Sequence, residues 1–452
     1  MTPDEWYDSF HDRTLRYAGR VLSRDRPIVI ELDAEYGARY DGQVAAIVAA
    51  NLLSRMSPRV IFDFPSVSIV KPLPWAQASL SEFVLSAARA ADPHGAFLCR
   101  QREEGDFVFH LGRRSPIAAV HGSGWGAFAG PGQSCIPDSN TNNPVGPALA
   151  VITAAARIFA SNLAPLDLAV AFDGFTWSDG PPNVDAPLPT NVDLGQLWSI
   201  GAGSVGTAAL YFLTLATRQF SSVVFDMDEV KVTNLDRSPI FTAEDAFENR
   251  LKAQAAETYL RNVGVQNVSF ENKPLDLSVR WRDRQENIPD VVIGAANERN
   301  VRYLIEQSFP PLQIYATTGR NWNITGFRHI PLVDPCSCCV FPPGTPMAAT
   351  ICAEGSVRDP VTHEDVDAAL PFLSFGAGLF TAAEILKAQM PHYPHSPNRI
   401  FFSASLNSAP HFTHAPMARR SNCVCASRSE PVHRRMIETT KYARLSLADA
   451  SI

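Results

Sequence analysis

One short segment constrains the fold more than any other: an apolar run, Leu197–Ile200, followed by the glycine-rich turn Gly201–Gly206 (sequence GAGSVG). The glycines follow the spacing G-x-G-x-x-G, and their flanks predict a strand before the turn and a helix, Thr207–Thr217, after it. In this context the first glycine allows a tight turn, the second lets a phosphate approach the backbone, and the third allows close helix–strand packing. The positive end of the helix dipole favours an anion at the same place. The sequence therefore predicts a nucleotide-binding α/β unit.

Length and charge limit the classes of protein to which this chain can belong. With 452 residues the chain is long enough for two or three domains. A net charge of −7 argues against non-specific nucleic-acid binding. No run of about 18 apolar residues predicts a membrane span, and the acidic N-terminus lacks the apolar stretch of a secretory signal. We therefore expect a cytoplasmic protein, in which the eight cysteines serve as metal ligands or reactive thiols before disulfides.

Strands and helices alternate twice along the chain, which predicts an α/β protein with two tandem, Rossmann-like, doubly wound parallel sheets. Near the start, Ile28–Leu32 and Val60–Phe64 are typical of strands and flank a predicted helix, Val44–Leu53. No glycine trio follows the first strand, and the carboxylates of Asp33 and Glu35 would repel a phosphate there. The first unit thus has the layout of a nucleotide-binding domain without its chemistry. The expected boundaries are a first unit at 1–180, a proline-rich linker at 181–192, a second unit at 193–426, and a polar, loosely ordered tail at 427–452.

An aspartate at the expected end of the next strand narrows the choice of ligand. Asp226 lies 20 residues after Gly206, where an acidic side chain accepts hydrogen bonds from ribose hydroxyls. The alternative is that Asp226 only caps a helix or closes a turn. Up to this residue, an NAD-dependent dehydrogenase and an ATP-using enzyme are equally supported.

Three polar residues farther along separate these two chemistries. Asn234 and Arg237 are three residues apart, and Lys252 follows on a predicted helix. Cations beside a phosphate cradle stabilise the charge of a triphosphate, whereas a dehydrogenase has less use for them. Any one of these residues taken alone would be interpreted as a solvated surface residue, but the ordered set favours ATP.

This ordered set resembles the ubiquitin-activating enzyme superfamily, which includes the ThiF- and MoeB-like sulfur-carrier adenylyltransferases. That superfamily carries a glycine-rich turn, an Asp-x-Asp, an Asn-x-x-Arg and a lysine in this order, and the match runs over most of residues 190–425. The resemblance implies two Rossmann-like adenylation domains, the first inactive and the second active. The ATP-binding residues that it implies are Gly201, Ala202, Gly203, Gly206, Asp226, Asp228, Asn234 and Asn297, with Arg237 and Lys252 at the triphosphate.

The N-terminal segment resembles the opening motif of the same superfamily. His11–Gly19 is similar to the family pattern Tyr-x-Arg-Gln-x-x-x-x-Gly, although Thr14 replaces the usual glutamine. In the family this arginine crosses a dimer or pseudo-dimer interface to reach ATP, so the resemblance implies that role for Arg13. The alternative is an ordinary arginine on a surface helix.

The expected Mg²⁺ site departs from the family pattern. Asn297 stands after the third strand, where the family usually has an aspartate that binds the ion. An amide oxygen can coordinate Mg²⁺ but brings no negative charge. Glu298 and Asp228 are further candidate ligands, so the sequence leaves this part of the site open.

Two pairs of cysteines predict a structural zinc site. Cys336 and Cys339 form a C-x-x-C, and Cys423 and Cys425 form a C-x-C far downstream. Four thiolates suit a closed tetrahedral Zn²⁺ site, which would hold the end of the chain against the sheet. The alternatives are four free thiols, or a ligand set that includes Cys338.

A further cysteine, Cys352, lies in a long loop at 342–371 that contains proline and glycine. Its surroundings resemble the family segment that crosses over the adenylate and carries a cysteine whose thiolate forms a thioester. The resemblance therefore implies that Cys352 is the nucleophile. The alternative for this residue is a small buried hydrophobic side chain.

By resemblance, we expect an enzyme that adenylates the C-terminal carboxylate of a ubiquitin-like protein with ATP and Mg²⁺, forms a thioester on Cys352, and passes the protein to a conjugating enzyme. The compact layout looks like that of the activating enzymes of bacterial ubiquitin-like operons, some of which act in antiphage defence. The sequence leaves the oligomeric state open, homo-oligomers included. Alternative functions are a sulfur-carrier adenylyltransferase, which would need no fused first unit, an NAD-dependent oxidoreductase, and a non-catalytic partner that has lost its chemistry.

Overall fold

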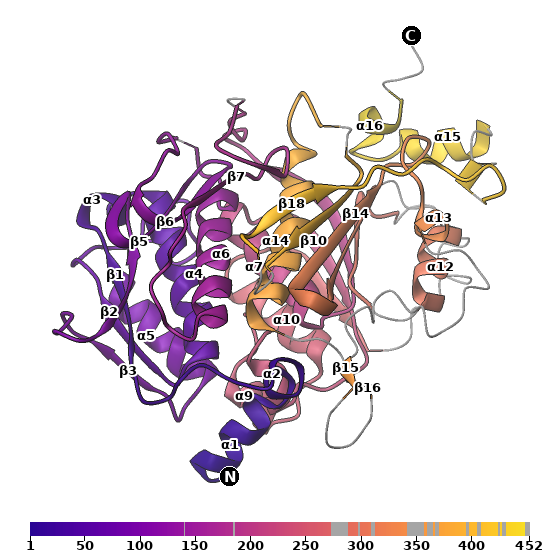
Figure 1. Ribbon diagram of the computed structural model, residues 1–452. Coiled ribbons are helices and arrows are strands. Elements are labelled where there is room, and N and C mark those ends of the chain that lie inside the picture. The colour runs from indigo at the N-terminus through magenta and orange to yellow at the C-terminus, as the bar shows by residue number, and fades with distance from the viewer. Residues whose placement is uncertain are drawn as a thin grey trace.

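The chain folds into an α/β structure with two mixed, eight-stranded sheets (Figure 1). Among the residues that the structure places, no helix has both the length and the apolar character needed to cross a membrane. The computed structural model describes the chain except for residues 140, 184–185, 273–287, 297–298, 309–311, 341–356, 359–364, 367–369, 395–396, 405–407, 424, 427–430 and 448–452.

The first sheet lies within residues 28–179 and has the strand order β3-β2-β1-β4-β5-β6-β7-β8. The pairs from β3 to β5 are parallel, and those from β5 to β8 are antiparallel. Ile28, Val29 and Ile30 in the central strand β1 are fully buried, as expected for the continuous apolar run of a parallel strand. The strands are β1 (Ile28–Leu32), β2 (Arg59–Asp63), β3 (Ala96–Cys99), β4 (Phe107–Leu111), β5 (Arg114–Ser123), β6 (Gly126–Gln133), β7 (Val170–Asp173) and β8 (Ser178–Asp179).

The second sheet repeats this arrangement with the order β11-β10-β9-β12-β13-β14-β17-β18. Strand β9 lies between β10 and β12, and its last residue, Ile200, is paired with Phe225 and Gly294. The carboxyl ends of three parallel strands therefore meet at one edge, where ligands of such sheets bind. The strands are β9 (Asp193–Ile200), β10 (Gln219–Phe225), β11 (Val268–Glu271), β12 (Val291–Gly294), β13 (Leu312–Gly319), β14 (Asn323–His329), β17 (Arg399–Ser403) and β18 (His411–His414), with a separate pair, β15 (Val357–Arg358) and β16 (Asp365–Val366).

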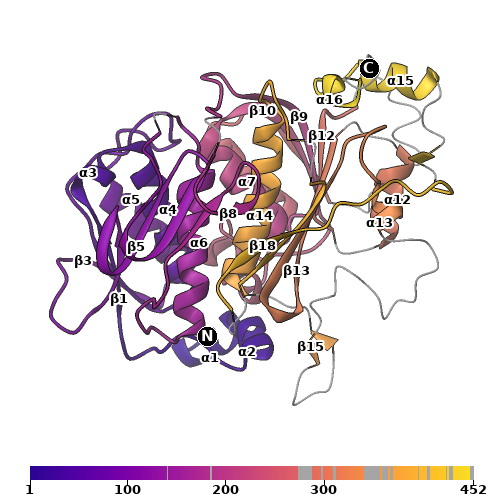
Figure 2. The same ribbon diagram turned by 45° about the horizontal axis from the view of Figure 1, so that its top comes forward.

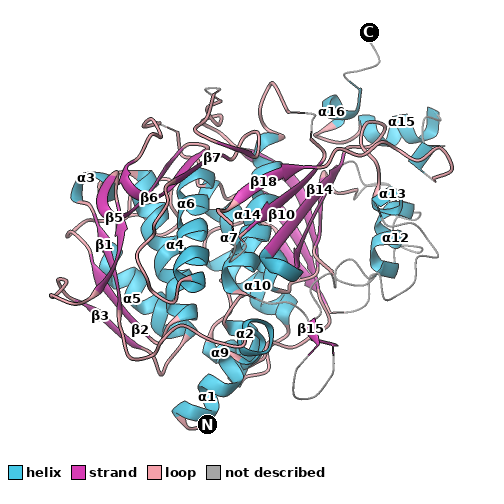
Figure 3. Cartoon of the chain, viewed as in Figure 1, coloured by secondary structure: helices cyan, strands magenta, loops and turns pink. Residues whose placement is uncertain are grey.

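The helices cover these sheets and join them (Figure 3). In the first half they are α1 (Pro3–Phe10), α2 (Asp12–Ala18), α3 (Ala34–Gly37), α4 (Tyr40–Met56), α5 (Leu80–Ala91) and α6 (Val145–Ala160). In the second half they are α7 (Ser204–Ala216), α8 (Val232–Leu235), α9 (Ala243–Phe247), α10 (Lys252–Asn262), α12 (Arg299–Ser308), η1 (Arg320–Trp322), α13 (Ser337–Val340), α14 (Pro371–Lys387), α15 (Pro431–Glu438) and α16 (Ala443–Leu447).

The α/β class and the two Rossmann-like sheets are confirmed, but the predicted parallel pairing holds for only part of each sheet. Strands β5 and β6 are joined by residues 124–125, and β13 and β14 by residues 320–322. A parallel connection needs a crossover of a dozen or more residues, so links this short force antiparallel pairing.

Four apolar helices form the centre of the molecule. Helices α4 and α6 of the first half pack on each other, α6 packs on α14, and α14 packs on α7. Figures 1 and 2 show these helices between the two sheets, while α12 and α13 lie beyond the second sheet, on its other side. Every residue of α14 is buried, including Glu384 and Lys387. The two halves therefore share one core.

A buried cluster of charged groups lies within this shared core. The Glu384 carboxylate accepts hydrogen bonds from Lys387 Nζ at 2.7 Å, Arg328 Nη1 at 3.2 Å and Tyr393 at 2.8 Å. Trp177 of the first half donates from its indole N–H to the same carboxylate at 2.6 Å. Burial raises the pKa of Glu384, but the charges of Lys387 and Arg328 lower it by more. The net pKa is about 2. The carboxylate is therefore held in its charged form.

The polar C-terminal segment is more structured than the sequence indicated. The expectation of a loosely ordered tail is wrong for α15 and α16, because Ile437, Tyr442 and Leu445 are buried. The Tyr442 hydroxyl donates to the carbonyl of Leu194 at 3.1 Å, which ties α16 to the start of β9. Hydrophobic residues spaced along a short helix can bury a stripe even where the composition is polar.

Candidate nucleotide-binding site

The glycine-rich turn follows β9 directly and leads into α7. Gly201 has φ +98°, a left-handed conformation that suits glycine, and a Cβ there would lie 2.8 Å from the backbone of Ala295. A Cβ at Gly206 would lie 2.2 Å from the carbonyl oxygen of Gly201. At Gly203, by contrast, nothing lies within 4 Å of the Cβ position. Gly201 and Gly206 are thus needed to build the turn, whereas Gly203 leaves space for a ligand at the N-terminus of α7.

Asp226 follows β10 and lies beside this turn. One carboxylate oxygen accepts a hydrogen bond from the backbone N–H of Ala202 at 2.7 Å, and the other from that of Asp228 at 2.9 Å. Burial raises the pKa of Asp226, while the charge of Lys252 lowers it. The carboxylate is fixed at the edge of the sheet, where it is placed to accept hydrogen bonds from a ribose.

Lys252 begins α10 and is bound to the same segment. Its ammonium nitrogen lies 2.7 Å from Asp228 Oδ2, and its backbone N–H donates to the carbonyl of Asp228 at 2.8 Å. The Lys252 side chain is largely buried, whereas that of Asp228 is mostly exposed. A cation and a carboxylate therefore stand together beside the turn.

The segment around α8 carries the predicted Asn234 and Arg237. Asn234 Oδ1 accepts from the backbone N–H of Lys231 at 2.9 Å, which fixes the first turn of α8. Arg237 Nη1 donates to the carbonyl of Thr233 and to Asp236 Oδ1, the latter at 2.7 Å. The Arg237 side chain is mostly buried.

Asp236 is a residue of the site that the sequence patterns did not single out. Its side chain is fully buried, and burial raises its pKa while Arg237 and Arg55 lower it. Thr14 of α2 donates to Asp236 Oδ2 at 3.0 Å. A buried aspartate without a helix or strand pattern around it gave no signal, because its partners come from a distant part of the chain.

The first half therefore reaches the site through α2. The Thr14–Asp236 hydrogen bond holds α2 against the segment after α8, and the Tyr17 hydroxyl donates to the carbonyl of Gly319 at 3.0 Å. Arg13 is the neighbour of Thr14, and its Nε makes no hydrogen bond among the described residues but lies 3.9 Å from Asp12 Oδ2. The contact between α2 and the segment after α8 is made within one chain.

Some predicted residues cannot be placed. Asn297 and Glu298 lie outside the described residues, and so does Cys352 with most of the loop at 342–371. Their roles remain predictions. Asp228 is the candidate Mg²⁺ ligand that the structure does place, and a carboxylate suits this ion.

The four predicted zinc ligands are brought together near α13. The sulfur atoms of Cys336, Cys339, Cys423 and Cys425 lie within 4.8 Å of one another. Cys336 and Cys423 are 3.4 Å apart, as are Cys339 and Cys425. Tetrahedral Zn²⁺ with ligands at about 2.3 Å separates its sulfurs by about 3.8 Å, so the cluster fits the ion. Cys338 is buried nearby but does not belong to this set.

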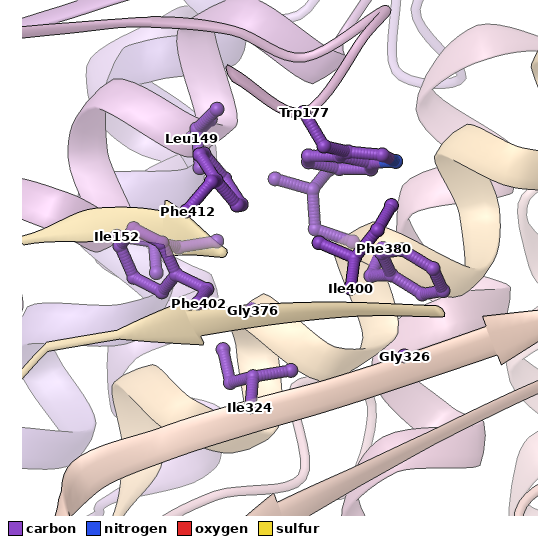
Figure 4. A pocket seen from close by; sticks show the side chains of 11 residues that line it. Leu149, Ile152, Trp177, Ile324, Gly326, Gly376, Phe380, Ile400, Phe402 and Phe412 are labelled. Carbon is purple, nitrogen blue, oxygen red and sulfur yellow. The ribbon is translucent and has the colours of Figure 1, made fainter. Parts of the chain in front are cut away.

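A small hollow between the two halves is a different kind of space (Figure 4). Figure 4 shows Trp177 and Phe380 facing this hollow, with Leu149 and Ile324 on other sides. The lining is apolar and offers no cation to a phosphate. The lining contains none of the residues of the nucleotide-binding site, so the hollow does not belong to that site.

Comparison with known proteins agrees with this arrangement. Residues 196–425 match the ThiF family, and the chain belongs to that family. The matched region contains the glycine-rich turn, Asp226, Arg237, Lys252 and all four clustered cysteines. The family part of the resemblance is thus confirmed.

Two curated relatives are similar to part of the chain. A sulfur carrier protein adenylyltransferase of Thermus thermophilus is 31% identical over 166 residues, which cover 35% of this chain and 60% of that protein. A sulfur carrier protein ThiS adenylyltransferase of Bacillus subtilis is 27% identical over 168 residues, which cover 36% of this chain and 48% of that protein. The chain thus spans about half of the length of these relatives.

Solved structures show a weaker likeness. E. coli MccB with ATP has a TM-score of 0.38 at 15% identity, and covers 51% of this chain and 66% of its own. MccB in complex with N-formylated MccA has a TM-score of 0.39 at 15% identity, covering 51% and 67%. At these scores the likeness carries no argument about function.

Proposed function

We propose that the chain uses ATP to adenylate the C-terminal carboxylate of a small carrier protein of the ubiquitin-like kind. The observation that carries this proposal is the convergence of the glycine-rich turn, Asp226, Asp228 and Lys252 at one edge of the second sheet. The names of the two curated relatives support the adenylation of a carrier protein. Membership of the ThiF family favours this reaction over that of an NAD-dependent oxidoreductase.

In the proposed reaction, a carboxylate oxygen of the carrier attacks the α-phosphorus of ATP. The bond from this phosphorus to the bridging oxygen of the β-phosphate breaks, pyrophosphate leaves with the electron pair, and a mixed anhydride with AMP remains. The attacking group is already charged, so the chain needs no general base. Catalysis then depends on positioning and on charge stabilisation.

Each proposed site residue has a role in this scheme. The Asp226 carboxylate accepts hydrogen bonds from the ribose, and the N-terminus of α7 faces the phosphates across Gly203. Arg237, Lys252 and Arg13 stabilise the charge that develops on the leaving pyrophosphate. Asp228 would hold Mg²⁺, which neutralises phosphate charge when bound. In this proposal Asn297 adds an uncharged ligand.

The direct test is the exchange of labelled pyrophosphate into ATP in the presence of a β-grasp carrier that ends in glycine. Arg237→Ala should reduce this exchange by about 100-fold or more, as expected for loss of one preorganised donor to the reacting phosphates. Arg89→Ala is a matched control, because Arg89 lies on α5 and donates to the carbonyl of Phe97. Exchange that survives Arg237→Ala at the level of the control would remove this arginine from the site.

A thioester step on Cys352 is the finer part of the proposal. The thiolate would attack the acyl carbon of the mixed anhydride, and AMP would leave. Cys352→Ala should then retain pyrophosphate exchange but lose an adduct with the carrier that reductant cleaves. An adduct that persists would assign the nucleophile to another cysteine. Transfer to a conjugating enzyme, and a role in a bacterial antiphage operon, are proposals by analogy only.

A sulfur-carrier adenylyltransferase is the second candidate, favoured by the names of both relatives. It shares the adenylation step and differs in the fate of the adenylated carrier. Conversion of the carrier C-terminus to a thiocarboxylate would support it, whereas the Cys352 adduct with subsequent transfer would support conjugation.

A further inference from the structure

One arginine of the first half has its backbone partners in the second half. Arg55 lies near the end of α4 and is 3% exposed. Its Nη1 donates to the carbonyl of Leu235, and its Nη2 donates to those of Pro239 and Phe241, both at 3.1 Å. Three carbonyls of one short segment are thus held by a single planar group.

A second side chain on the same face of α4 completes this contact. Asn51 lies one helical turn before Arg55, and its Oδ1 accepts from Arg55 Nε at 2.8 Å. The Asn51 amide also donates to the carbonyl of Pro239 at 3.0 Å. Asn51 therefore fixes the orientation of the Arg55 guanidinium, so that little conformational entropy is lost when Arg55 binds the segment.

The segment that Arg55 and Asn51 bind, 235–241, includes Arg237, the cation proposed to contact ATP. It begins directly after Asn234 and includes Arg237, whose guanidinium is bound to Asp236 at 2.7 Å. Arg55 is close enough to Asp236 for their charges to attract each other. Burial lowers the pKa of Arg55 to about 10, so it is still a cation at neutral pH. Three ionisable side chains in a row, Arg55, Asp236 and Arg237, connect α4 to the segment at 235–241.

We infer that Arg55 is a positioning residue, which fixes the backbone of 235–241 and thereby aims Arg237 at the phosphates of ATP. The inference rests on the proposed function, since it assigns Arg237 to the triphosphate. It gives the first half a role that needs no nucleotide of its own. In this role, Arg55 of the first half fixes the backbone position of residues 235–241 in the second half.

A purely structural arginine would behave differently, and the chain offers a matched control. Arg20 also belongs to the first half, and its Nη2 donates to two carbonyls, those of Phe159 at 3.0 Å and Ala160 at 2.7 Å. These carbonyls end α6 and do not belong to the segment at 235–241. Arg20→Met therefore removes a comparable set of hydrogen bonds without releasing Arg237.

The experiment measures the binding of ATP and of AMP to the full chain by calorimetry, because AMP lacks the phosphates that Arg237 would contact. Arg55→Met should weaken ATP binding by about tenfold or more and leave AMP binding within about twofold. Arg20→Met should leave both within about twofold. Amide hydrogen exchange at 235–241 should become faster in Arg55→Met and stay unchanged in Arg20→Met.

The outcomes separate this inference from the function on which it rests. Wild-type protein that does not bind ATP overturns the proposed function and the inference with it. Two results overturn the inference alone, provided that the wild-type protein binds ATP. In the first, Arg55→Met binds ATP as well as the wild type does. In the second, Arg55→Met loses affinity for ATP and AMP alike. If Arg55→Met does not fold, Arg55→Lys is measured by the same criterion, because the three N–H donors of an ammonium cannot serve the three carbonyls and Asn51 Oδ1 together. A selective loss of ATP affinity in Arg55→Lys supports the inference, and its absence overturns it.

Discussion

The two halves of the molecule share one strand order and differ at the turn that follows their first strand. In the second half, Gly201–Gly203 leads directly into α7. In the first half a longer segment, Asp33–Arg39, separates β1 from α4 and contains the short helix α3. The Tyr36 side chain of this segment is buried and fills the space beside the strand end. A common scaffold therefore carries a phosphate cradle in only one of its two copies.

The hydrogen bonds of the first-half turn show why it cannot serve a phosphate. Asp33 accepts from the backbone N–H of Tyr36 at 3.0 Å and so caps α3. The Tyr36 hydroxyl donates to the carbonyl of Gly122 at 2.7 Å and accepts from its N–H at 3.1 Å. Groups that could face a ligand are bound within the chain. A half without a phosphate cradle thus still contacts the other half, through Thr14 at Asp236 and through Arg55 at Pro239 and Phe241.

Removal of zinc should give the largest difference in stability between the two halves. Among the described residues, the cluster of four thiols occurs only in the second half. We expect about one Zn²⁺ per chain, and binding free energy at such sites is on the order of 10 kcal/mol. Metal analysis should find the ion, and a chelator should speed hydrogen exchange in α12 and α13 before it does so in β1 to β4.

Cys336→Ser should reproduce the effect of the chelator. Cys99→Ser is the matched control, because Cys99 is exposed in the first half. A stable wild-type protein that contains no metal would refute the zinc site.

Loss of the buried Glu384 carboxylate should have the next largest effect on the free energy of unfolding. Glu384→Gln removes the charge opposite Lys387 and Arg328, and breaking a buried pair of this kind costs about 3–5 kcal/mol in the free energy of unfolding. Glu31→Gln in the first half should cost about 1 kcal/mol or less, because Glu31 and its partner His110 are partly exposed. Urea denaturation at pH 7 measures both.

The pH dependence of the same variant follows from the depressed pKa. The pKa of Glu384 is about 2 in the folded protein, against an ordinary value of 4.5. Its contribution is therefore fully present above about pH 4.5 and is lost as the pH falls toward 2. The stability gap between wild type and Glu384→Gln should shrink between pH 5 and pH 3. A gap that stays constant there would mean that Glu384 is not held as a carboxylate.

A side chain at the open glycine should affect binding more than folding. Gly203→Val places atoms where nothing lies within 4 Å, so the free energy of unfolding should change by only about 1 kcal/mol. ATP binding should weaken about 100-fold, or about 2.7 kcal/mol, because the side chain occupies the phosphate position. Ala34→Val, an exposed position in the first-half turn, should leave ATP binding unchanged. Equal effects of the two variants on ATP affinity would place the nucleotide elsewhere.

The smallest effect should come from the first-half turn itself. Tyr36→Phe removes the hydroxyl that binds both backbone groups of Gly122, which should cost about 1–2 kcal/mol in urea denaturation. ATP affinity, measured by calorimetry, should stay the same. A change in ATP affinity would show that the first-half turn takes part in the site after all.

Local patterns in the sequence were enough to predict much of this molecule. The run of Leu197–Ile200 with the glycines after it predicted β9, the turn and α7, since each depends on neighbours a few residues away. The same holds for Asp226 at the end of β10. The spacing of Cys336 and Cys339 with the later pair predicted the thiol cluster, because few other arrangements use four thiols in this way.

Tertiary structure alone decided how the halves complete each other. The Arg55–Leu235 contact joins residues 180 positions apart, and the Thr14–Asp236 contact joins residues 222 apart. No local periodicity encodes such pairs, because they exist only once α4, α6, α7 and α14 have packed into one core. The sequence by itself therefore determined which half can hold a nucleotide. The packing of the four helices decided which residues of the first half contact the second half, since hydrogen bonds between distant segments depend on where the core places them.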